Sequence, residues 1–210
     1  MKKIIFLSSL FTFGFFAGTA GIDAKYIIPV IVVVMLFYYG YYLNIMFFTK
    51  NVNLVERYLQ KRRKNPYYAV MIASANKDFE AAEQNLNKLS SLYNQSKMII
   101  KSSILLETNQ LEEAEKTIGQ IKAETAKNHN LALLGLIKGD WDLFNQSKAR
   151  LKNQTFVHAL EAEAAYHRGD YQEADLSGTL AINSSGGFQK WVLVKSLEHQ
   201  KNNPDRRSYF

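Results

Sequence analysis

The residues that could do chemistry in this chain are its histidines and carboxylates, since the sequence contains no cysteine. On a helix, His158 would share a face with Glu161, and Glu163 would share a face with His167. Such pairs could bind a metal ion or pass a proton. A di-metal carboxylate site, however, needs two Glu-x-x-His pairs on facing helices, and the sequence has none. We therefore expect no catalytic residue, no metal site, no cofactor and no enzyme activity.

Two further motifs have simpler explanations than a reaction site. Residues 140–142 read Asp-Trp-Asp, which is the pattern of a turn followed by a helix start. Residues 184–187 read Ser-Ser-Gly-Gly and lack the lysine and the strand of a phosphate-binding loop. We expect both segments to be turns between helices.

The positive charge of the chain is concentrated in one strip. The formal net charge is +7, yet residues 65–210 carry 17 basic and 17 acidic groups, while residues 50–64 carry six basic groups and one acidic group. A nucleic-acid-binding domain would carry its charge on a folded face, so we expect no nucleic acid partner. The strip instead predicts contact with anionic lipid headgroups, worth about 1 kcal/mol per cation, through Lys61, Arg62, Arg63 and Lys64.

Two apolar spans precede this strip and predict a membrane anchor. They run over Ile4–Ile22 and Tyr26–Phe48, and each is long enough to cross a hydrocarbon layer of roughly 30 Å as a helix. Residues 1–49 are therefore predicted to form a two-helix transmembrane hairpin, in which Gly14 and Gly18 allow close packing. The first span could instead be a cleaved signal peptide. In both cases the basic flank places the rest of the chain in the cytoplasm.

Residues 50–65 are predicted to form a short basic helix next to the membrane. Leu54, Val55, Tyr58 and Leu59 would share one face, which favours a helix lying along the lipid interface. A straight continuation of the second span into water is the alternative. Asn65-Pro66 would end the helix in either case.

Beyond Pro66 the pattern is helical, and one phrase recurs with a nearly constant period. A polar turn is followed by a bulky residue and then, usually, by alanine three positions later; the bulky residues are spaced by 32, 30 and 30 positions, at Phe79, Leu111, Trp141 and Tyr171. Asparagine or glycine can end one helix and aspartate can begin the next, while alanine allows two helices to approach. A period of this size is typical of stacked helical hairpins.

At these residues the chain resembles the tetratricopeptide (TPR) repeat family, in which a G-x-[YFW]-x-x-A phrase joins helix A to helix B. The resemblance covers about residues 66–183, and Phe188–Lys201 would be a closing helix. Leu86 and Ile118 fit the apolar position of helix B, whereas Lys148 and Gly178 do not. The resemblance implies an all-α fold in which the hairpin precedes an α-solenoid of about four helix pairs over residues 66–201. A non-repeating helical bundle is the alternative, and residues 202–210 are expected to be disordered.

In the TPR family, helix A lines a concave groove that binds segments of other proteins. Aligning the chain with this pattern implies that the groove contains Met71, Leu106, Leu133, Leu136, Ile137, Glu163, Tyr166 and His167. The lysine and asparagine clamp for acidic peptides is missing, so an apolar helix or extended peptide is the better ligand. Several of these residues could instead belong to the core.

Two functions follow from this organisation. The first is a scaffold or adaptor that is integral to a membrane, expected to be a bacterial plasma membrane, and that presents a protein-binding domain in the cytoplasm. The alternative is an accessory or assembly subunit of a membrane protein complex, bound to its partner through the transmembrane hairpin.

Overall fold

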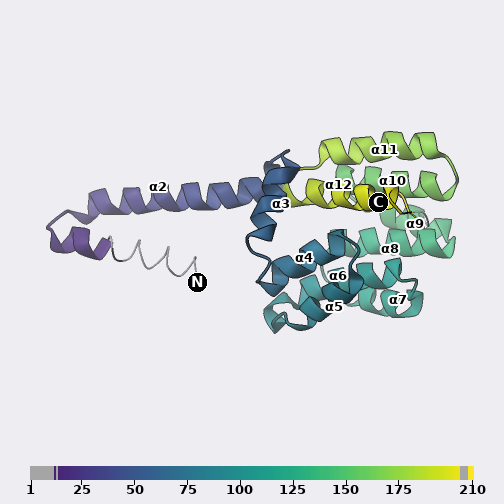
Figure 1. The fold of residues 1–210 in the computed structure, drawn as a ribbon, viewed down its shortest axis with the longest axis horizontal. Coiled ribbons are helices and arrows are strands. Elements are labelled where there is room, and N and C mark those ends of the chain that lie inside the picture. Colours follow the sequence, from purple (N-terminus) through teal and green to yellow (C-terminus); the bar gives the residue numbers. More distant parts are fainter. Residues whose placement is uncertain (1–11, 13, 204–207) are drawn as a thin grey trace.

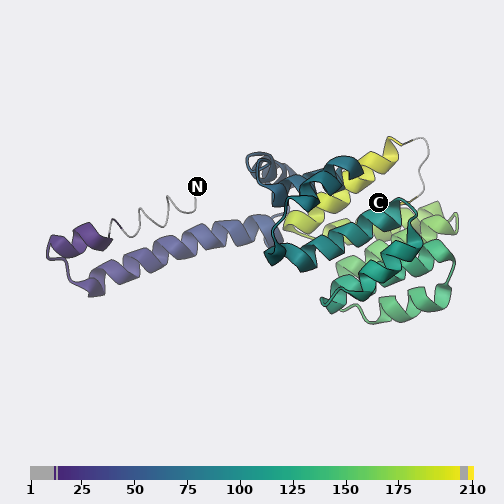
Figure 2. The same ribbon diagram turned by 90° about the horizontal axis from the view of Figure 1, so that it is seen from below.

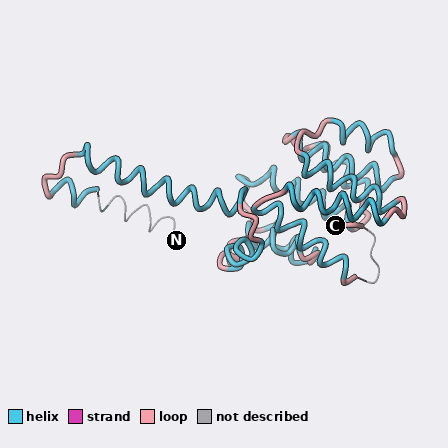
Figure 3. The backbone as a smooth tube through the Cα atoms, turned by 90° about the horizontal axis from the view of Figure 1, so that it is seen from above, coloured by secondary structure: helices cyan, strands magenta, loops and turns pink. Residues whose placement is uncertain are grey.

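The computed structural model describes residues 12, 14–203 and 208–210, and every regular element in these residues is a helix (Figures 1 and 3). The predicted all-helical fold is therefore confirmed for this part of the chain. The elements are α2 (Ala24–Leu43), η1 (Asn44–Phe48), α3 (Val52–Gln60), α4 (Pro66–Ala75), α5 (Phe79–Asn87), η2 (Ser91–Tyr93), α6 (Asn94–Glu107), α7 (Leu111–Gly119), α8 (Glu124–Lys138), α9 (Trp141–Ala149), α10 (Gln154–His167), α11 (Tyr171–Ser184) and α12 (Gly187–Lys201).

One helix among the described residues is long and apolar enough to cross a membrane. It comprises α2 and η1, runs over Ala24–Phe48, and extends away from the other helices (Figure 1). Residues 14–19 are helical and fold back toward it, so that Gly14 lies beside Ile31, while Gly18 has no such neighbour. Residues 4–11 and 13 of the predicted first span, Ile4–Ile22, lie outside the described residues.

The apolar face of the helix predicted over residues 50–65 does not point toward lipid as expected. A new helix, α3, begins where Thr49 adopts an extended conformation and the Asn51 side chain accepts a hydrogen bond from the Leu54 N–H. It runs across the end of α2 rather than continuing it (Figure 1). Its apolar face is buried with Trp191 of α12, because that helix offers an apolar partner inside the protein. The predicted contact of this face with lipid is therefore wrong.

Four helix pairs follow, and each is joined by a tight turn where the sequence predicts one. The pairs are α4–α5, α6–α7, α8–α9 and α10–α11. Each turn contains a residue in the left-handed region, where glycine and asparagine are most easily accommodated; these residues are Lys77, Asn109, Gly139 and Gly169. Three of the second helices begin with an aspartate cap, at Asp78, Asp140 and Asp170.

The small residues of the recurring phrase lie where the paired helices touch. Ala82, Ala114 and Ala174 are fully buried, as predicted. The bulky residues contribute less than expected, because Trp141 is 40% exposed and Tyr171 is 63% exposed. Short side chains already close these helix contacts, so the large rings remain at the edge of the pair.

The last helix closes the arrangement. α12 contacts α11, which precedes it, and also η1, α3 and α4 (Figures 1 and 2). Trp191 is fully buried at the junction with α3. A helix is therefore present over the predicted range Phe188–Lys201, and it contacts both the last helix pair and the first.

The expected disorder of residues 202–210 is wrong for the residues that the structure describes at its end. Tyr209 is 3% exposed and Phe210 is 8% exposed. Both side chains pack against alanines of α10 and α11. Burial of these two large aromatic rings is the apolar contribution that opposes the loss of conformational entropy in this segment.

Candidate functional site

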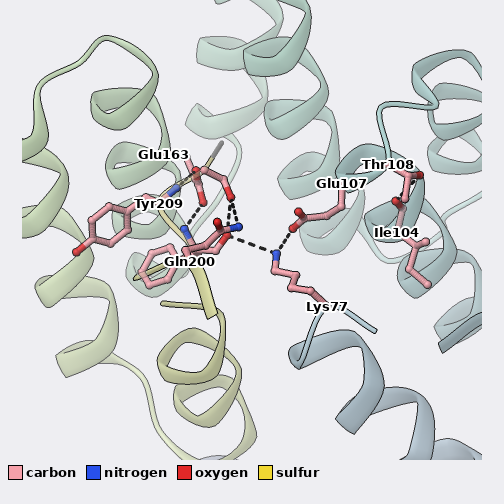
Figure 4. A network of polar contacts seen from close by, with 9 residues as sticks. Lys77, Ile104, Glu107, Thr108, Glu163, Gln200 and Tyr209 are labelled. Carbon is pink, nitrogen blue, oxygen red and sulfur yellow. Dashed lines mark hydrogen bonds and ion pairs between the residues drawn. The ribbon is translucent and has the colours of Figure 1, made fainter. Parts of the chain in front are cut away.

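Residues from several helices surround the segment Ser208–Phe210 (Figure 4). We call this set the segment seat. It is made by side chains of α10, α11 and α12 and by the turn between α4 and α5, and it comprises Lys77, Glu163, Tyr166, Asp175, Gly178 and Gln200. These residues are far apart in the sequence, so only the folded domain brings them together.

Glu163 binds the main chain of the segment. Its Oε2 atom accepts a hydrogen bond of 2.8 Å from the Tyr209 N–H, and its Oε1 atom accepts one of 2.9 Å from the Phe210 N–H. The residue is only 7% exposed. Successive main-chain N–H groups are good ligands for an anion, and they are present in any peptide except at proline.

Lys77 contacts the same segment from the opposite side. Its Nζ atom donates to the main-chain oxygen of Phe210 at 3.4 Å and forms an ion pair with Glu107 at the end of α6. The left-handed conformation of Lys77 places it in the turn, from which its side chain reaches inward (Figure 4). Donor and acceptor groups of the bound main chain are thus both satisfied by charged side chains, of which Glu163 is buried and Lys77 is half-buried.

The Tyr209 ring occupies a space that depends on Gly178. A methyl group at position 178 would overlap the ring, so no larger residue fits there with Tyr209 in place. The Tyr209 hydroxyl donates a hydrogen bond of 3.0 Å to Oδ1 of Asp175, which lies about one turn before Gly178 on α11. The Tyr209 ring is therefore a physical reason for glycine at position 178.

Small residues also form the floor of the seat. The rings of Tyr209 and Phe210 pack against short side chains of α10 and α11, namely Ala159, Ala162, Ala165, Ala174 and Ala181. On the α12 side, Gln200 Nε2 donates to Ser208 Oγ at 2.8 Å, and Ser208 Oγ donates to the Phe210 main-chain oxygen at 2.8 Å. The seat therefore combines an apolar floor with polar groups at its rim.

Burial dominates the electrostatics of the seat. Removal from water raises the pKa of Glu163 to about 7, although its bonds from Phe210 and Tyr209 lower the pKa. Glu107 raises the pKa further and Lys77 lowers it. A buried carboxylate is stable only when it is hydrogen-bonded. The two N–H groups of the segment supply the hydrogen bonds that the Glu163 carboxylate needs.

The predicted groove residues divide into three groups. Glu163 and Tyr166 contact the segment, Tyr166 through a ring-to-ring distance of 6.5 Å to Tyr209. Leu106 and Leu136 are only 4% and 5% exposed and belong to the core. Of the remaining predicted residues, Met71, Leu133 and Ile137 are half-buried, and His167 is exposed. Burial of the two leucines removes them from any open binding surface.

The four cations predicted to contact lipid headgroups, residues 61–64, lie between α3 and α4. Lys61, Arg63 and Lys64 are exposed. Arg62 is partly used inside the domain, because its guanidinium lies 3.6 Å from the Tyr58 ring centroid and donates to the Tyr58 carbonyl at 3.2 Å. Three of the four predicted cations therefore remain available to a membrane surface.

Other features of the described residues are less specific. No group of three or more histidine, aspartate or glutamate side chains in this part of the chain could hold a metal ion. An open cavity of about 370 Å³ lies between α9, α10 and α11, and another of about 520 Å³ lies between α12 and the α4–α5 turn. No protein-family model, no curated protein and no solved structure matches this chain.

Proposed function

We propose that this protein is a membrane-anchored scaffold or adaptor that binds segments of other proteins at the cytoplasmic face of a membrane. In this proposal α2 and η1 cross the bilayer, and α4–α11 form a TPR-like solenoid that α12 closes. The single observation that carries the proposal is the way the domain holds Ser208–Phe210. Buried Glu163 and half-buried Lys77 satisfy main-chain groups of this segment, as a protein surface would do for the main chain of a bound peptide.

The joint between the apolar helix and the helical domain supports an anchoring role. The Gly187 N–H donates to the Thr49 carbonyl at 2.7 Å, and Lys50 Nζ donates to the Ser185 carbonyl at 2.6 Å. A methyl group on Gly187 would overlap the main chain of Met46. Trp191 Nε1 also donates to Glu56 of α3. Such close contacts would hold the domain at a defined position relative to the bilayer.

The charge distribution supports cytoplasmic placement. The exposed cations Lys61, Arg63 and Lys64 follow the apolar helix closely in the sequence. Positively charged flanks remain on the cytoplasmic side of bacterial and other membranes. In this orientation the same cations would contact anionic headgroups.

Site-specific photocrosslinking in intact membranes tests the proposal. A photoreactive phenylalanine analogue at Tyr166 probes the seat, and the same analogue at Glu113, an exposed residue of α7, is the matched control. We expect a discrete crosslinked protein from position 166 and none from position 113. Equal crosslinking from both positions, or none from either, would contradict the adaptor function.

The accessory-subunit function is kept as a second candidate because of the surface of α2. Tyr39 and Tyr41 are 54% and 56% exposed, and their hydroxyl groups would need partners wherever α2 meets hydrocarbon. A neighbouring transmembrane helix could supply such partners. A crosslinker at Leu36, which is 66% exposed, would then capture a membrane protein while position 166 captures none.

A further inference from the structure

We propose that the segment seat is a binding site for a short, turned peptide segment in which a tyrosine is followed by a second aromatic residue, and that Ser208–Phe210 is an internal ligand which a partner segment displaces. This inference rests on the proposed adaptor function and names its ligand. The partner is a protein that presents such a pair in a flexible segment.

Glu163 and Lys77 form hydrogen bonds to main-chain atoms, so these contacts do not depend on the side chains of the bound segment. Glu163 accepts from two successive N–H groups, and Lys77 donates to the next main-chain oxygen. Any segment that turns so that two successive N–H groups point to the same side, and that has no proline at these two positions, offers the same groups. A peptide arriving from another protein could therefore replace each of these bonds.

The selectivity comes from the side-chain positions. The missing side chain of Gly178 leaves room for the tyrosine ring, and Asp175 accepts a hydrogen bond from the tyrosine hydroxyl. Phenylalanine at the first position would lose this hydrogen bond, and an aliphatic residue would fill the space poorly. The second ring packs in the alanine-lined floor at a ring distance of 4.9 Å from Tyr209.

Chain length favours internal binding over exchange between two copies. Only residues 204–207 separate Ser208 from Asn203, which lies two positions after the end of α12. An extended stretch of this length spans less than about 20 Å, so the segment stays close to its own seat. A short tether of this kind gives an effective concentration in the millimolar range. A partner segment must therefore compete with a ligand that is always near.

Peptide binding to the full chain in detergent micelles tests the inference. The variant Tyr209→Ala/Phe210→Ala empties the seat and leaves every seat residue unchanged. The probe is a fluorescent peptide with the sequence of residues 203–210, followed by fluorescence anisotropy. We expect saturable binding to this variant, and at least about tenfold weaker binding to the unmodified protein because of the tethered competitor. A peptide with alanine at both aromatic positions should not bind.

A third substitution supplies the matched control. Adding Gly178→Ala to the double variant places a methyl group in the space of the tyrosine ring, while alanine is well accepted within a helix. We expect this triple variant to keep its helicity and lose peptide binding.

Several outcomes would overturn the inference. It fails if the folded double variant does not bind the peptide, or if Gly178→Ala leaves the binding unchanged. It also fails if the double variant loses cooperative unfolding, since the segment would then be core. A dimer that dissociates in the double variant would instead identify a second copy as the occupant. The two proposals fail separately. If the peptide does not bind but position 166 still crosslinks to a partner, the adaptor function stands and only the proposed ligand is wrong. If position 166 yields no crosslinked partner, the adaptor function itself is contradicted.

Discussion

Replacing Glu163 with glutamine should change how the stability of the protein depends on pH. Burial raises the pKa of Glu163 from 4.5 to about 7 in the folded protein. Between these two values the folded state binds a proton that the unfolded state has released. The contribution of Glu163 to stability is therefore complete below pH 4.5 and is lost as the pH rises to about 7.

The size of the effect follows from the same shift. One pKa unit corresponds to about 1.4 kcal/mol, so a shift from 4.5 to about 7 is worth about 3 kcal/mol. Glu163→Gln cannot titrate, and its amide group offers one oxygen to two N–H donors. We expect the variant to have a pH-independent loss of one hydrogen bond, and to lack the decline of about 3 kcal/mol that the unmodified protein shows.

Urea unfolding of the full chain in micelles, followed by far-ultraviolet circular dichroism, measures this difference. The free energy of unfolding is compared at pH 4.5 and pH 8 for both proteins. Partial removal of the imidazoles from water lowers the pKa of His129 and of His167, which makes stability rise with pH near 6.5. Both histidines remain in the variant, so their effect cancels in the comparison. Parallel stability curves for the two proteins would refute the electrostatic account of the seat.

Three further predictions concern the joint, the helix pairs and the topology. Gly187→Ala should destabilise the joint by about 1–3 kcal/mol, because the added methyl overlaps the Met46 main chain; thermal unfolding measures this, and Gly119→Ala, which meets no atom within 4 Å, should change little. Ala174→Leu should overpack the fully buried contact between α10 and α11 and cost about 1–3 kcal/mol, whereas the exposed Ala149→Leu should be neutral in the same urea experiment. Reporter fusions after Lys64 should be active only on the cytoplasmic side, and activity on the other side of the membrane would reverse the proposed orientation.

The helix pairs could be predicted because their signals are local. A turn residue, an aspartate cap and an alanine lie within a few positions of one another, and Gly169, Asp170 and Ala174 occupy these roles in the structure. The rules that govern helix ends act over the same short distance. The period of the phrase was therefore sufficient to place four turns.

The seat could be predicted only in part because its contacts join distant residues. Alignment placed Glu163 and Tyr166 on an inner face, but nothing near Lys77 in the sequence indicates that it reaches Phe210. Gly178 was the available signal, since it interrupts the expected apolar pattern. Its partner Tyr209 lies in a polar stretch that composition alone assigns to a disordered tail.

The apolar face of α3 illustrates a second limit. Val55, Tyr58 and Leu59 would be equally stable against lipid or against another apolar helix. The choice between these two depends on α12, which follows more than 120 residues later and supplies Trp191. A local pattern can show that a face is buried without showing what buries it.

Amide hydrogen exchange at Tyr209 and Phe210 tests the central claim most directly, because both N–H groups are held by the Glu163 carboxylate. We predict that both amides exchange at least about 100-fold more slowly than in an unstructured peptide, and that Glu163→Ala removes most of this protection while the core of α10 remains protected. Exchange at the unstructured rate in the unmodified protein would contradict the account, since the segment would then not occupy the seat.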